Sequence, residues 1–441
     1  KLQSLSSTET LYSAVTLNAA TGGLTTGTTA TSISATNVTL VKGDNTVYLS
    51  MYPQAVTGLQ AIVTMSTGKQ YSCTILKSSK TLEAGKLYSA SRTVYGPTLY
   101  ITSTKTKPIT MVVSSVDYDD TALAPGGTFE TKAKACIDYM FNVEPYKTYK
   151  EYFNVYIIPT KNSDVGYTST TTTVDSKKTY SYTIDIVEGP LQGFMKQNCP
   201  DIYNNKTDIY NLTVALLANT DIYFGKTLST NVGLDCAVTT AADGKWGWRG
   251  NNGSIVTNGS AVTNSGDYKN VFLHEFAGHG FGRLADEYWY DNALTYSGNV
   301  LEGYHAWTVP FGKNTISAAE SQVTSTYYWR HMVSGIGAEG ETFPKEGLFE
   351  GGFVYGKGVY RPEQISVMDD NRPYFNAYSR QLIVERILSL AGETFNYATF
   401  KTNDKNFDSV AGNVQNTTRA ANVVTVEPME PPTLLELNVN R

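Results

Sequence analysis

The sequence predicts a multi-domain α+β protein, with an N-terminal all-β sandwich followed by a larger unit that mixes helices and strands. Three observations predict this fold class. The chain has 441 residues, which is enough for two or three domains. Its first part alternates apolar and polar residues with the two-residue period of strands. Beyond residue 127 a helical period appears, followed by further strand-like runs.

Several short runs near the start of the chain predict the strands of the first domain. Alternating residues occur at 47–52 and 71–75, and β-prone runs follow at 98–101 and 109–113. The runs are separated by turn-forming residues, a spacing typical of a β-sandwich. We therefore expect a β-sandwich domain over residues 1–120.

A change of composition at 117–127, from Asp-Tyr-Asp-Asp to Ala-Pro-Gly-Gly, predicts a domain boundary. A helix is expected directly after it, because four apolar residues share one helical face: Phe129, Ala133, Ile137 and Met140. Strand-like runs follow at 153–158 and 212–218. The larger unit is expected over residues 128–392. A β-leaning extension at 393–441 is expected to pack on it.

The composition excludes several classes of protein. Hydrophobic residues make up 41% of the chain and charged residues 17%, which is typical of a globular protein with few charges. The net charge is −5 and no cluster of lysine and arginine occurs, so we expect no nucleic-acid partner. The longest apolar runs, such as 214–218, are too short for a transmembrane segment.

The amino acids also bear on location and on cysteine chemistry. Thr, Ser, Asn, Gly and 31 Tyr residues give a hydrated composition common on extracellular surfaces, so we expect a secreted or cell-surface protein. The first residue is lysine, so a lipid anchor upstream of this sequence is compatible with it. Four cysteines without a CxxC pair exclude a cysteine zinc site. A Cys199–Cys236 disulfide and four buried thiols both remain open.

The hexapeptide His274-Glu-Phe-Ala-Gly-His279 is the motif that points to a chemistry. Two neutral imidazoles and an adjoining glutamate are what a zinc hydrolase presents from one helix, with the glutamate as general base. The usual spacing of the histidines is four residues, and here it is five. In a regular α-helix that spacing leaves the side chains about 140° apart. We therefore predict a π-bulge between Glu275 and His279, which Gly278 makes less costly.

A catalytic zinc ion needs a third protein ligand and an open position. Asp286 lies seven residues after His279 and is the first candidate, and Glu287 is the second. More distant acids are the remaining candidates: Glu302, Glu320 and Glu350. The other two histidines, His305 and His331, are expected to pack beside aromatic residues.

The stretch from His274 to Tyr288 resembles the immunoglobulin A peptidase family, gut-bacterial zinc metallopeptidases that are metzincin-like endopeptidases. Three later stretches are similar to the C-terminal part of that family: 347–352, 360–362 and 366–369. The resemblance implies a metzincin-like zinc peptidase domain in the larger unit, on the bacterial outer surface or in the periplasm. It also implies that Gly282 turns the chain toward the metal and that Asp286 is the third ligand.

The resemblance further implies that Met368 is the Met-turn residue, which forms a hydrophobic floor beneath the zinc. Metzincins carry a transition-state tyrosine two residues after this methionine, whereas Asp370 stands there in this chain. Tyr374 and Tyr378 are the candidates for that stabilising role, with packed aromatic residues as the alternative. Both fall in or near a last helix expected to begin close to Pro373 and to end at Gly392.

We therefore expect a zinc-dependent metalloendopeptidase that hydrolyses peptide bonds of extracellular proteins or glycoproteins. Zinc-activated water would attack the peptide carbonyl, with Glu275 as general base and then as acid. The alternative is a catalytically inactive surface adhesin or glycan-binding protein with a peptidase-like domain. The inserted residue in the histidine motif favours that alternative. So does the stretch 80–88, which resembles fimbrillin-type modules of gut bacterial surface proteins.

Overall fold

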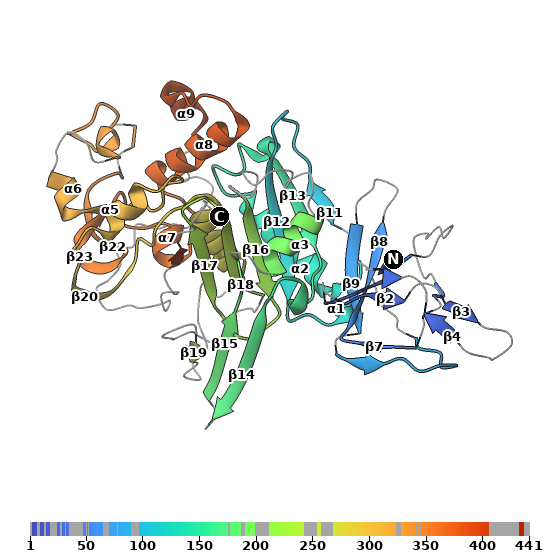
Figure 1. Ribbon diagram of the computed structural model, residues 1–441. Coiled ribbons are helices and arrows are strands. Elements are labelled where there is room, and N and C mark those ends of the chain that lie inside the picture. The colour runs from blue at the N-terminus through green and yellow to red at the C-terminus, as the bar shows by residue number, and fades with distance from the viewer. Residues whose placement is uncertain are drawn as a thin grey trace. The chain divides into compact units, whose positions relative to one another are not determined.

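The protein is described by a computed structural model, and it is a mixed α/β protein with several sheets (Figure 1). The structure describes residues 2–6, 9–12, 15–17, 24–26, 29–30, 32–34, 47–49, 51, 53–64, 70–76, 78–89, 97–174, 177–186, 190–198, 211–241, 254–256, 268–322, 328–340, 342–343, 345–404 and 432–435. The chain divides into two compact units, Lys1–Gly96 and Pro97–Arg441. Within the described ranges, no helix combines the length and the hydropathy needed to cross a membrane.

Strands are the regular elements described in the first unit. Four of them form an antiparallel sheet in the order β6-β1-β8-β9: β6 (Ser32–Ile33), β1 (Leu2–Ser4), β8 (Leu59–Thr64) and β9 (Gln70–Leu76). Six short strands make three further pairs: β2 (Leu11–Tyr12) with β5 (Thr29–Ala30), β3 (Val15–Leu17) with β4 (Leu24–Thr26), and β7 (Ala55–Val56) with β10 (Lys80–Thr81). A small apolar core contains residues of β1, β2, β7 and β8 and the residue after β10: Leu2, Leu11, Val56, Leu59 and Leu82.

Among the described residues of the run expected at 47–52, no strand is formed. Residues 47–49 lie outside any strand, and the side chain of Tyr48 is 80% exposed. An alternating run becomes a strand only where a neighbouring strand accepts its hydrogen bonds, and no described strand pairs with this run. The run expected at 71–75 does form a strand, within β9.

The second unit is built on a seven-stranded sheet in the order β11-β13-β12-β16-β18-β17-β24. The strands are β11 (Thr98–Ile101), β13 (Phe153–Ile158), β12 (Ile109–Val116), β16 (Thr213–Ala218), β18 (Asp235–Thr240), β17 (Gly225–Thr230) and β24 (Thr433–Leu435). The four central strands run parallel, which fits their nearly continuous apolar sequences. Strand β17 runs antiparallel to β18, and β24 lies parallel to β17.

The division between the units differs from the boundary expected at 117–127. Strands β11 and β12, expected in the first domain, belong to the sheet of the second unit. Strand β12 pairs with β13 on one side and with β16 on the other, so both of its edges are used within this sheet. A period-two pattern identifies a strand but not the strands it pairs with. The sequence pattern therefore could not show that the division between the units comes before β11.

Two helices of the second unit form where the sequence predicts them. Helix α2 (Thr128–Met140) buries the four apolar residues of its expected face, Phe129, Ala133, Ile137 and Met140. The last predicted helix is α8 (Ala377–Ala391), with Gly392 in a left-handed conformation at its end. It begins after Pro373 because the Asn376 side chain accepts a hydrogen bond from the Ser379 amide and caps it.

The other described helices of this unit are α1 (Asp120–Leu123), α3 (Pro190–Asn198), α4 (Tyr268–Phe272), α5 (Val300–His305), α6 (Ala318–Gln322), α7 (Val367–Asp370) and α9 (Tyr397–Asn403). Short 3-10 turns occur at Lys150–Tyr152, Asn162–Asp164 and Arg330–Met332. The extension after 393 thus begins with a helix, not with the expected β structure. Asn396 caps α9 and Phe400 anchors it by burial. Its strand β24 pairs with β17 of the main sheet.

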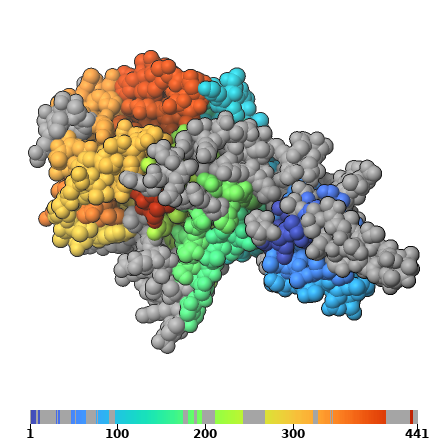
Figure 2. All heavy atoms as spheres, viewed as in Figure 1, coloured from blue at the N-terminus to red at the C-terminus, as the bar shows by residue number. Residues whose placement is uncertain are grey.

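Two smaller sheets complete the second unit. Strands β14 (Thr168–Val174) and β15 (Lys177–Thr183) form a long hairpin that extends away from the main sheet (Figure 1), and β19 (Ser254–Val256) pairs with it. Figure 2 shows the hairpin as a green projection. The other sheet contains β20 (Trp289–Thr295), β21 (Ile316–Ser317), β22 (Phe349–Gly352) and β23 (Val354–Arg361).

Candidate metal centre

The histidine motif lies on a π-helix, as the spacing of its histidines predicts. Helix α4 continues directly into a π-helical segment, η3 (Leu273–Phe281), which contains the whole hexapeptide. All nine residues of η3 are buried. The predicted bulge is therefore confirmed, and it extends over more of the helix than the single turn expected. His274 and His279 are five positions apart, and the wider winding of a π-helix brings their rings to the same side.

Two hydroxyl groups from outside the helix lie within hydrogen-bond distance of its carbonyl oxygens. The hydroxyl of Tyr146 donates to the carbonyl oxygen of Ala277 at 2.6 Å, and that of Thr227 lies 3.0 Å from the carbonyl oxygen of Glu275. Both side chains are buried. Since a π-helix is less stable than an α-helix in isolation, such contacts help to hold this winding in the folded protein.

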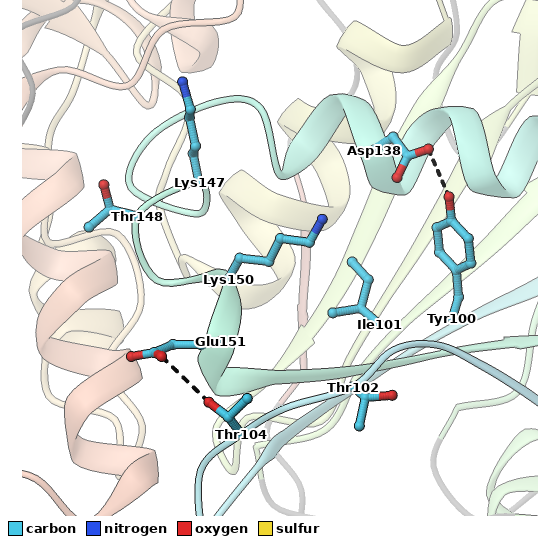
Figure 3. A pocket seen from close by; sticks show the side chains of 9 residues that line it. All are labelled: Tyr100, Ile101, Thr102, Thr104, Asp138, Lys147, Thr148, Lys150 and Glu151. Carbon is cyan, nitrogen blue, oxygen red and sulfur yellow. Dashed lines mark hydrogen bonds between the residues drawn. The ribbon is translucent and has the colours of Figure 1, made fainter.

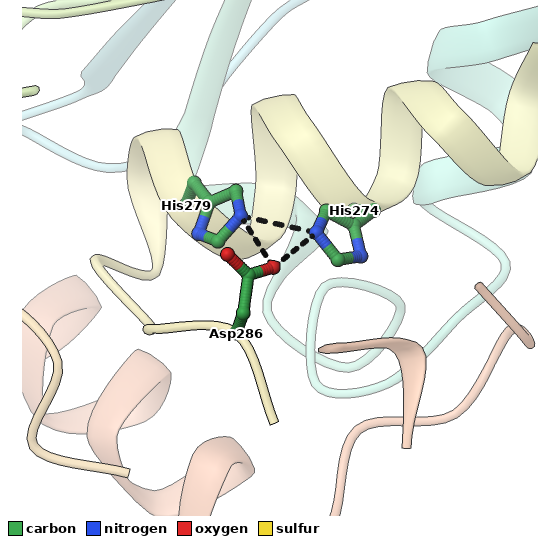
Figure 4. A group of neighbouring side chains, drawn as sticks. All are labelled: His274, His279 and Asp286. Atoms are coloured by element: carbon green, nitrogen blue, oxygen red, sulfur yellow. Dashed lines mark hydrogen bonds and ion pairs between the residues drawn. The ribbon is translucent and has the colours of Figure 1, made fainter. Parts of the chain in front are cut away.

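Three buried side chains bring donor atoms together at the end of η3 (Figure 4). The Nε2 atoms of His274 and His279 lie 3.0 Å apart. The Asp286 Oδ1 atom lies 3.1 Å from each of these nitrogens. Four-coordinate zinc sites have ligand distances of about 2.0–2.2 Å, which places neighbouring ligand atoms about 3.3 Å apart. The three donors have close to this separation.

The hydrogen bonds of the two histidine rings show which ring nitrogens are left to bind a metal. The Nδ1 atom of His274 lies 2.8 Å from the carbonyl oxygen of Val367, and that of His279 lies 2.6 Å from the carbonyl oxygen of Leu284. A carbonyl oxygen only accepts, so both Nδ1 atoms carry the proton. When both rings are neutral, as metal binding requires, the Nε2 lone pairs face each other and the Asp286 carboxylate. A cation between them removes this repulsion, so the donor set fits a divalent metal.

The ionisation of the same groups agrees with a site that attracts positive charge. Burial opposes the charged form of His279, but the charge of Asp286 and then of Glu275 outweighs it and raises the pKa of His279 to about 9. Burial likewise opposes the ionised form of Asp286, yet the neighbouring imidazoles lower the pKa of this carboxyl overall. Both shifts show that the negative charges of Asp286 and Glu275 favour a positive charge where the three side chains meet.

The turn after η3 is made by a residue other than the glycine expected to make it. Gly282 has φ −70°, a conformation open to any residue, whereas Arg283 has the left-handed φ of 53°. A Cβ atom at position 282 would lie 2.8 Å from the carbonyl oxygens of Ala277 and of Gly278. Glycine is therefore required at this position because the backbone of η3 is too close for a side chain.

The side chain of Arg283 makes four hydrogen bonds, which offset the cost of its left-handed backbone. It donates to the Asp235 carboxylate at 2.6 Å and to the carbonyl oxygens of Thr230 (2.8 Å), Val309 (2.9 Å) and Pro310 (3.1 Å). No spacing rule marks an arginine for this task. Its position directly after Gly282 is the one signal that the sequence offers.

The glutamate of the motif lies against strand β17. Both Gly225 and Thr227 of that strand contact it, and the Thr227 hydroxyl lies 2.6 Å from Glu275 Oε2. The Oε1 atom is buried and makes no hydrogen bond to the described residues. Burial raises the pKa of this carboxyl. A buried carboxylate with one unused oxygen is suited to accept a proton.

Comparison with known proteins bears directly on this geometry. The family model of the IgA peptidase M64 matches residues 102–307, a range that contains η3 and all three donors. These residues belong to the IgA peptidase family. The resemblance noted for His274–Tyr288 is thereby confirmed. A search of curated proteins found no match to the chain.

The IgA peptidase match assigns this part of the chain to a family of peptidases, which are hydrolases acting on proteins. It begins inside the second unit, just after β11, and ends before the stretches at 347–352 and 366–369. The group of possible metal ligands and the family match therefore fall in the same segment of the chain.

Met368, which lies beyond the matched residues, packs directly against η3. Its Sδ atom occupies the space that a side chain at position 278 would need. Gly278 thus permits close packing with Met368, in addition to any ease it brings to the helix distortion. Helix α7, which carries Met368, also provides the Val367 carbonyl that orients His274. This hydrogen bond joins the histidine motif to a segment that lies 93 positions later in the sequence.

Glu287, the second candidate ligand, faces away from the donor set of the IgA peptidase domain. Its carboxyl group accepts hydrogen bonds from Ser366 Oγ at 2.5 Å, Asn314 Nδ2 at 2.9 Å and Asn376 Nδ2 at 2.9 Å. Burial raises its pKa to about 7, although these hydrogen bonds act in the opposite direction. Asn314 also bonds both backbone groups of Ala285 and so fixes the residue before Asp286.

The distant acidic candidates are engaged elsewhere. Glu302 accepts from the Tyr296 hydroxyl, Glu320 lies 3.0 Å from His305 Nδ1, and Glu350 accepts from the Gly358 amide. His331 contacts the rings of Tyr378 and Tyr397, so both other histidines lie beside aromatic residues as expected. Cys236 is a buried thiol of β18, whereas Cys199 lies outside the described residues.

The two tyrosines considered for transition-state stabilisation make other contacts in this structure. The Tyr374 hydroxyl donates to the Glu363 carboxylate, with oxygen separations of 2.8 and 2.9 Å. The ring of Tyr378 packs on that of Trp329, with centroids 5.5 Å apart. Neither hydroxyl is seen to bond to the three donors, and a role for either residue in the reaction stays a prediction.

A cavity of about 650 Å³ opens elsewhere in the second unit (Figure 3). It is lined by residues of β11, of the end of α2 and of the segment before β13: Tyr100, Ile101, Thr102, Thr104, Asp138, Lys147, Thr148, Lys150 and Glu151. None of them belongs to the donor set. The cavity and the donor set are therefore separate features of the second unit.

Proposed function

We propose that this chain is a zinc-dependent metalloendopeptidase that hydrolyses peptide bonds of extracellular proteins or glycoproteins. One observation carries the proposal: two imidazoles on a π-helix and Asp286 direct two nitrogen atoms and one oxygen atom to one point, beside a buried glutamate. The match to the IgA peptidase family supports hydrolysis of proteins. Zinc is the metal we assign, because two imidazoles and one carboxylate are a common ligand set of catalytic zinc.

The proposal includes the architecture around the site. The second unit would have a metzincin-like fold, in which Asp286 is the third ligand and Met368 is the Met-turn residue. The packing of Met368 against Gly278 supports its role as the Met-turn residue. The first unit, whose described elements are strands, would be a β-sandwich. A secreted or cell-surface location would give the enzyme access to extracellular substrates.

His274, His279 and Asp286 would hold the zinc ion, which when bound supplies Lewis acidity to the peptide carbonyl and to the attacking water. Glu275 would take the proton of that water on Oε1, the oxygen left without a hydrogen bond. It would then deliver the proton to the nitrogen of the departing amine. The water oxygen forms the new bond to the carbonyl carbon as the carbon–nitrogen bond breaks, so the products are a carboxylate and an amine.

The first test combines metal analysis with the Glu275→Gln variant. Purified protein should contain close to one zinc ion per chain, measured by inductively coupled plasma mass spectrometry. It should cleave fluorescently labelled casein or a protein from a panel of extracellular glycoproteins. Glu275→Gln should keep the zinc and lower the cleavage rate by at least about 100-fold, because general acid–base catalysis contributes roughly that much.

The alternative, an inactive adhesin or glycan-binding protein, predicts a different pattern. In that case the protein would cleave nothing in the panel, and Glu275→Gln would match the wild type. An absence of stoichiometric zinc together with an absence of cleavage would refute the peptidase proposal.

A further inference from the structure

The contact between strand β17 and the glutamate of the histidine motif has a chemical consequence beyond packing. Thr227 is fully buried and sits in the middle of β17, where its backbone pairs with Ala237 of β18. Its Oγ1 atom lies 2.6 Å from Glu275 Oε2 and 3.0 Å from the carbonyl oxygen of the same residue. One side chain therefore contacts both the helix backbone and the reacting group of the glutamate.

The two oxygens of the Glu275 carboxylate have different surroundings because of this contact. Oε2 receives a short, charge-assisted hydrogen bond from Thr227. Oε1 receives none from the described residues. A hydroxyl bond of this kind favours one orientation of a side chain that otherwise has three rotatable bonds.

Strand β17 shapes the position of the carboxylate from a second point. Gly225 lies two residues before Thr227, so both positions face the same side of the strand. A Cβ atom at position 225 would lie 2.6 Å from Glu275 Cγ and 2.8 Å from Glu275 Oε1. The glutamate side chain thus occupies the space left by the missing side chain of Gly225, with Thr227 beside it.

We infer that Thr227 is a positioning residue, which holds Glu275 by Oε2 and so leaves Oε1 as the oxygen that exchanges protons with water and the leaving amine. This inference rests on the proposed peptidase function and adds a residue to it. Thr227 touches neither substrate nor metal on this view. It acts through Glu275, by keeping the unused oxygen in one place during the two proton transfers.

The test compares variants that differ in a single hydroxyl group. Thr227→Val keeps the shape and the strand preference of threonine but removes the hydroxyl. Thr227→Ser keeps the hydroxyl. Thr239→Val is the matched control, because Thr239 is buried in the neighbouring strand β18 and its hydroxyl has no hydrogen-bond partner among the described residues.

For Thr227→Val we expect kcat to fall about 10- to 100-fold, the scale of one charge-assisted hydrogen bond, with KM within about twofold of the wild type. Thr227→Ser should restore kcat to within about threefold. Thr239→Val should resemble the wild type in kcat. Zinc content should be unchanged in all three. A crystal structure of Thr227→Val should show Glu275 displaced from β17 or in more than one rotamer.

Several outcomes would overturn the inference while leaving the proposed function intact. One is an active wild type with a Thr227→Val variant of unchanged kcat. Another is a Thr227→Ser variant as impaired as Thr227→Val, since that would trace the effect to the methyl group and to packing. If Thr227→Val fails to fold, Thr227→Ala and Thr227→Ser make the same comparison. A wild type without zinc or cleavage would instead refute the proposed function itself.

Discussion

At the scale of single residues, two neighbouring acids take opposite tasks. Asp286 meets the imidazoles of His274 and His279, whereas Glu287 bonds to Ser366 and to two asparagine side chains. The two carboxyl groups thus have separate sets of partners, although they belong to adjacent residues. The orientation is set by backbone contacts on either side: Asn314 bonds to Ala285, and the Glu287 amide bonds to the Met368 carbonyl.

Substitution of the two acids should separate their roles. Asp286→Ala should lose zinc, with affinity reduced by more than about 100-fold, because one of three donors is gone. Glu287→Gln should retain close to one zinc ion per chain, since an amide can still accept from Ser366 or from an asparagine. Competition with a fluorescent zinc chelator measures both affinities. Retention of zinc by Asp286→Ala, or its loss in Glu287→Gln alone, would reverse the assignment.

At the scale of elements, the π-helix η3 depends on the segments packed around it. Met368 of α7 fills the space beside Gly278, Tyr146 bonds to the Ala277 carbonyl, and Thr227 of β17 bonds to Glu275. A five-residue histidine spacing needs the π winding in order to gather its rings. The unusual helix is thus a product of its neighbours as well as of its own sequence.

The contact between η3 and α7 can be measured through Gly278. Gly278→Ala should lower the free energy of unfolding by about 1–3 kcal/mol, since the added methyl group overlaps Met368. Combining it with Met368→Ala should cost less than the sum of the two single changes, because the methyl group then enters vacated space. Urea denaturation of the four proteins measures these terms.

The control for this series is Gly193→Ala in α3, where nothing lies within 4 Å of the added Cβ. There alanine should stabilise the protein by up to about 1 kcal/mol through its higher helix propensity. Additive effects of Gly278→Ala and Met368→Ala would show that the two residues do not compete for the same space.

At the scale of the whole molecule, the centre is assembled from distant parts of one unit. Strand β17, helix η3, the loop at 284–288 and helix α7 each contribute to it. Beside it, a pair of buried glutamates lies at the start of α8. Glu346 accepts from the Tyr378 amide at 3.0 Å, and Glu363 accepts from the Tyr374 hydroxyl and the Ala377 amide.

This pair makes stability depend on pH. Burial, and then the charge of Glu363, raises the pKa of Glu346 well above its ordinary value. Below the pKa of the unfolded chain, about 4.3, both states carry the proton. As the pH rises towards the raised pKa, the unfolded chain releases the proton and the folded protein keeps it. The stabilising contribution is therefore present in acid and lost as the pH rises.

Glu346→Gln should remove much of this dependence. The free energy of unfolding of the wild type should fall between pH 5 and 8, by up to about 1.4 kcal/mol per pH unit for one proton. The variant should show a shallower slope, and Glu393→Gln, an exposed position of the same unit, should keep that of the wild type. Denaturation series across this pH range measure the slopes. Equal slopes for Glu346→Gln and the wild type would contradict the assignment.

Much of this protein was open to prediction from local sequence. The α2 face, the strands at 153–158 and 213–218, and the π-bulge in the histidine motif follow from spacing and periodicity. The residue patterns that predict these features each span a short stretch of the chain, although the π-helix is also held by its packed neighbours. The family resemblance likewise rested on fifteen consecutive residues, His274–Tyr288, and the match to the IgA peptidase model confirmed it.

Tertiary structure alone decided the rest. Strands 98–101 and 109–116 joined the second unit because their partners lie 40 or more residues away. Residues 397–403 form a helix because Asn396 caps its first turn and Phe400 is buried against the rest of the unit. The left-handed Arg283 and the Thr227 contact depend on groups about 50 residues distant. Periodicity reports which face of an element is buried, whereas the identity of the group that meets it is set only when distant segments pack together.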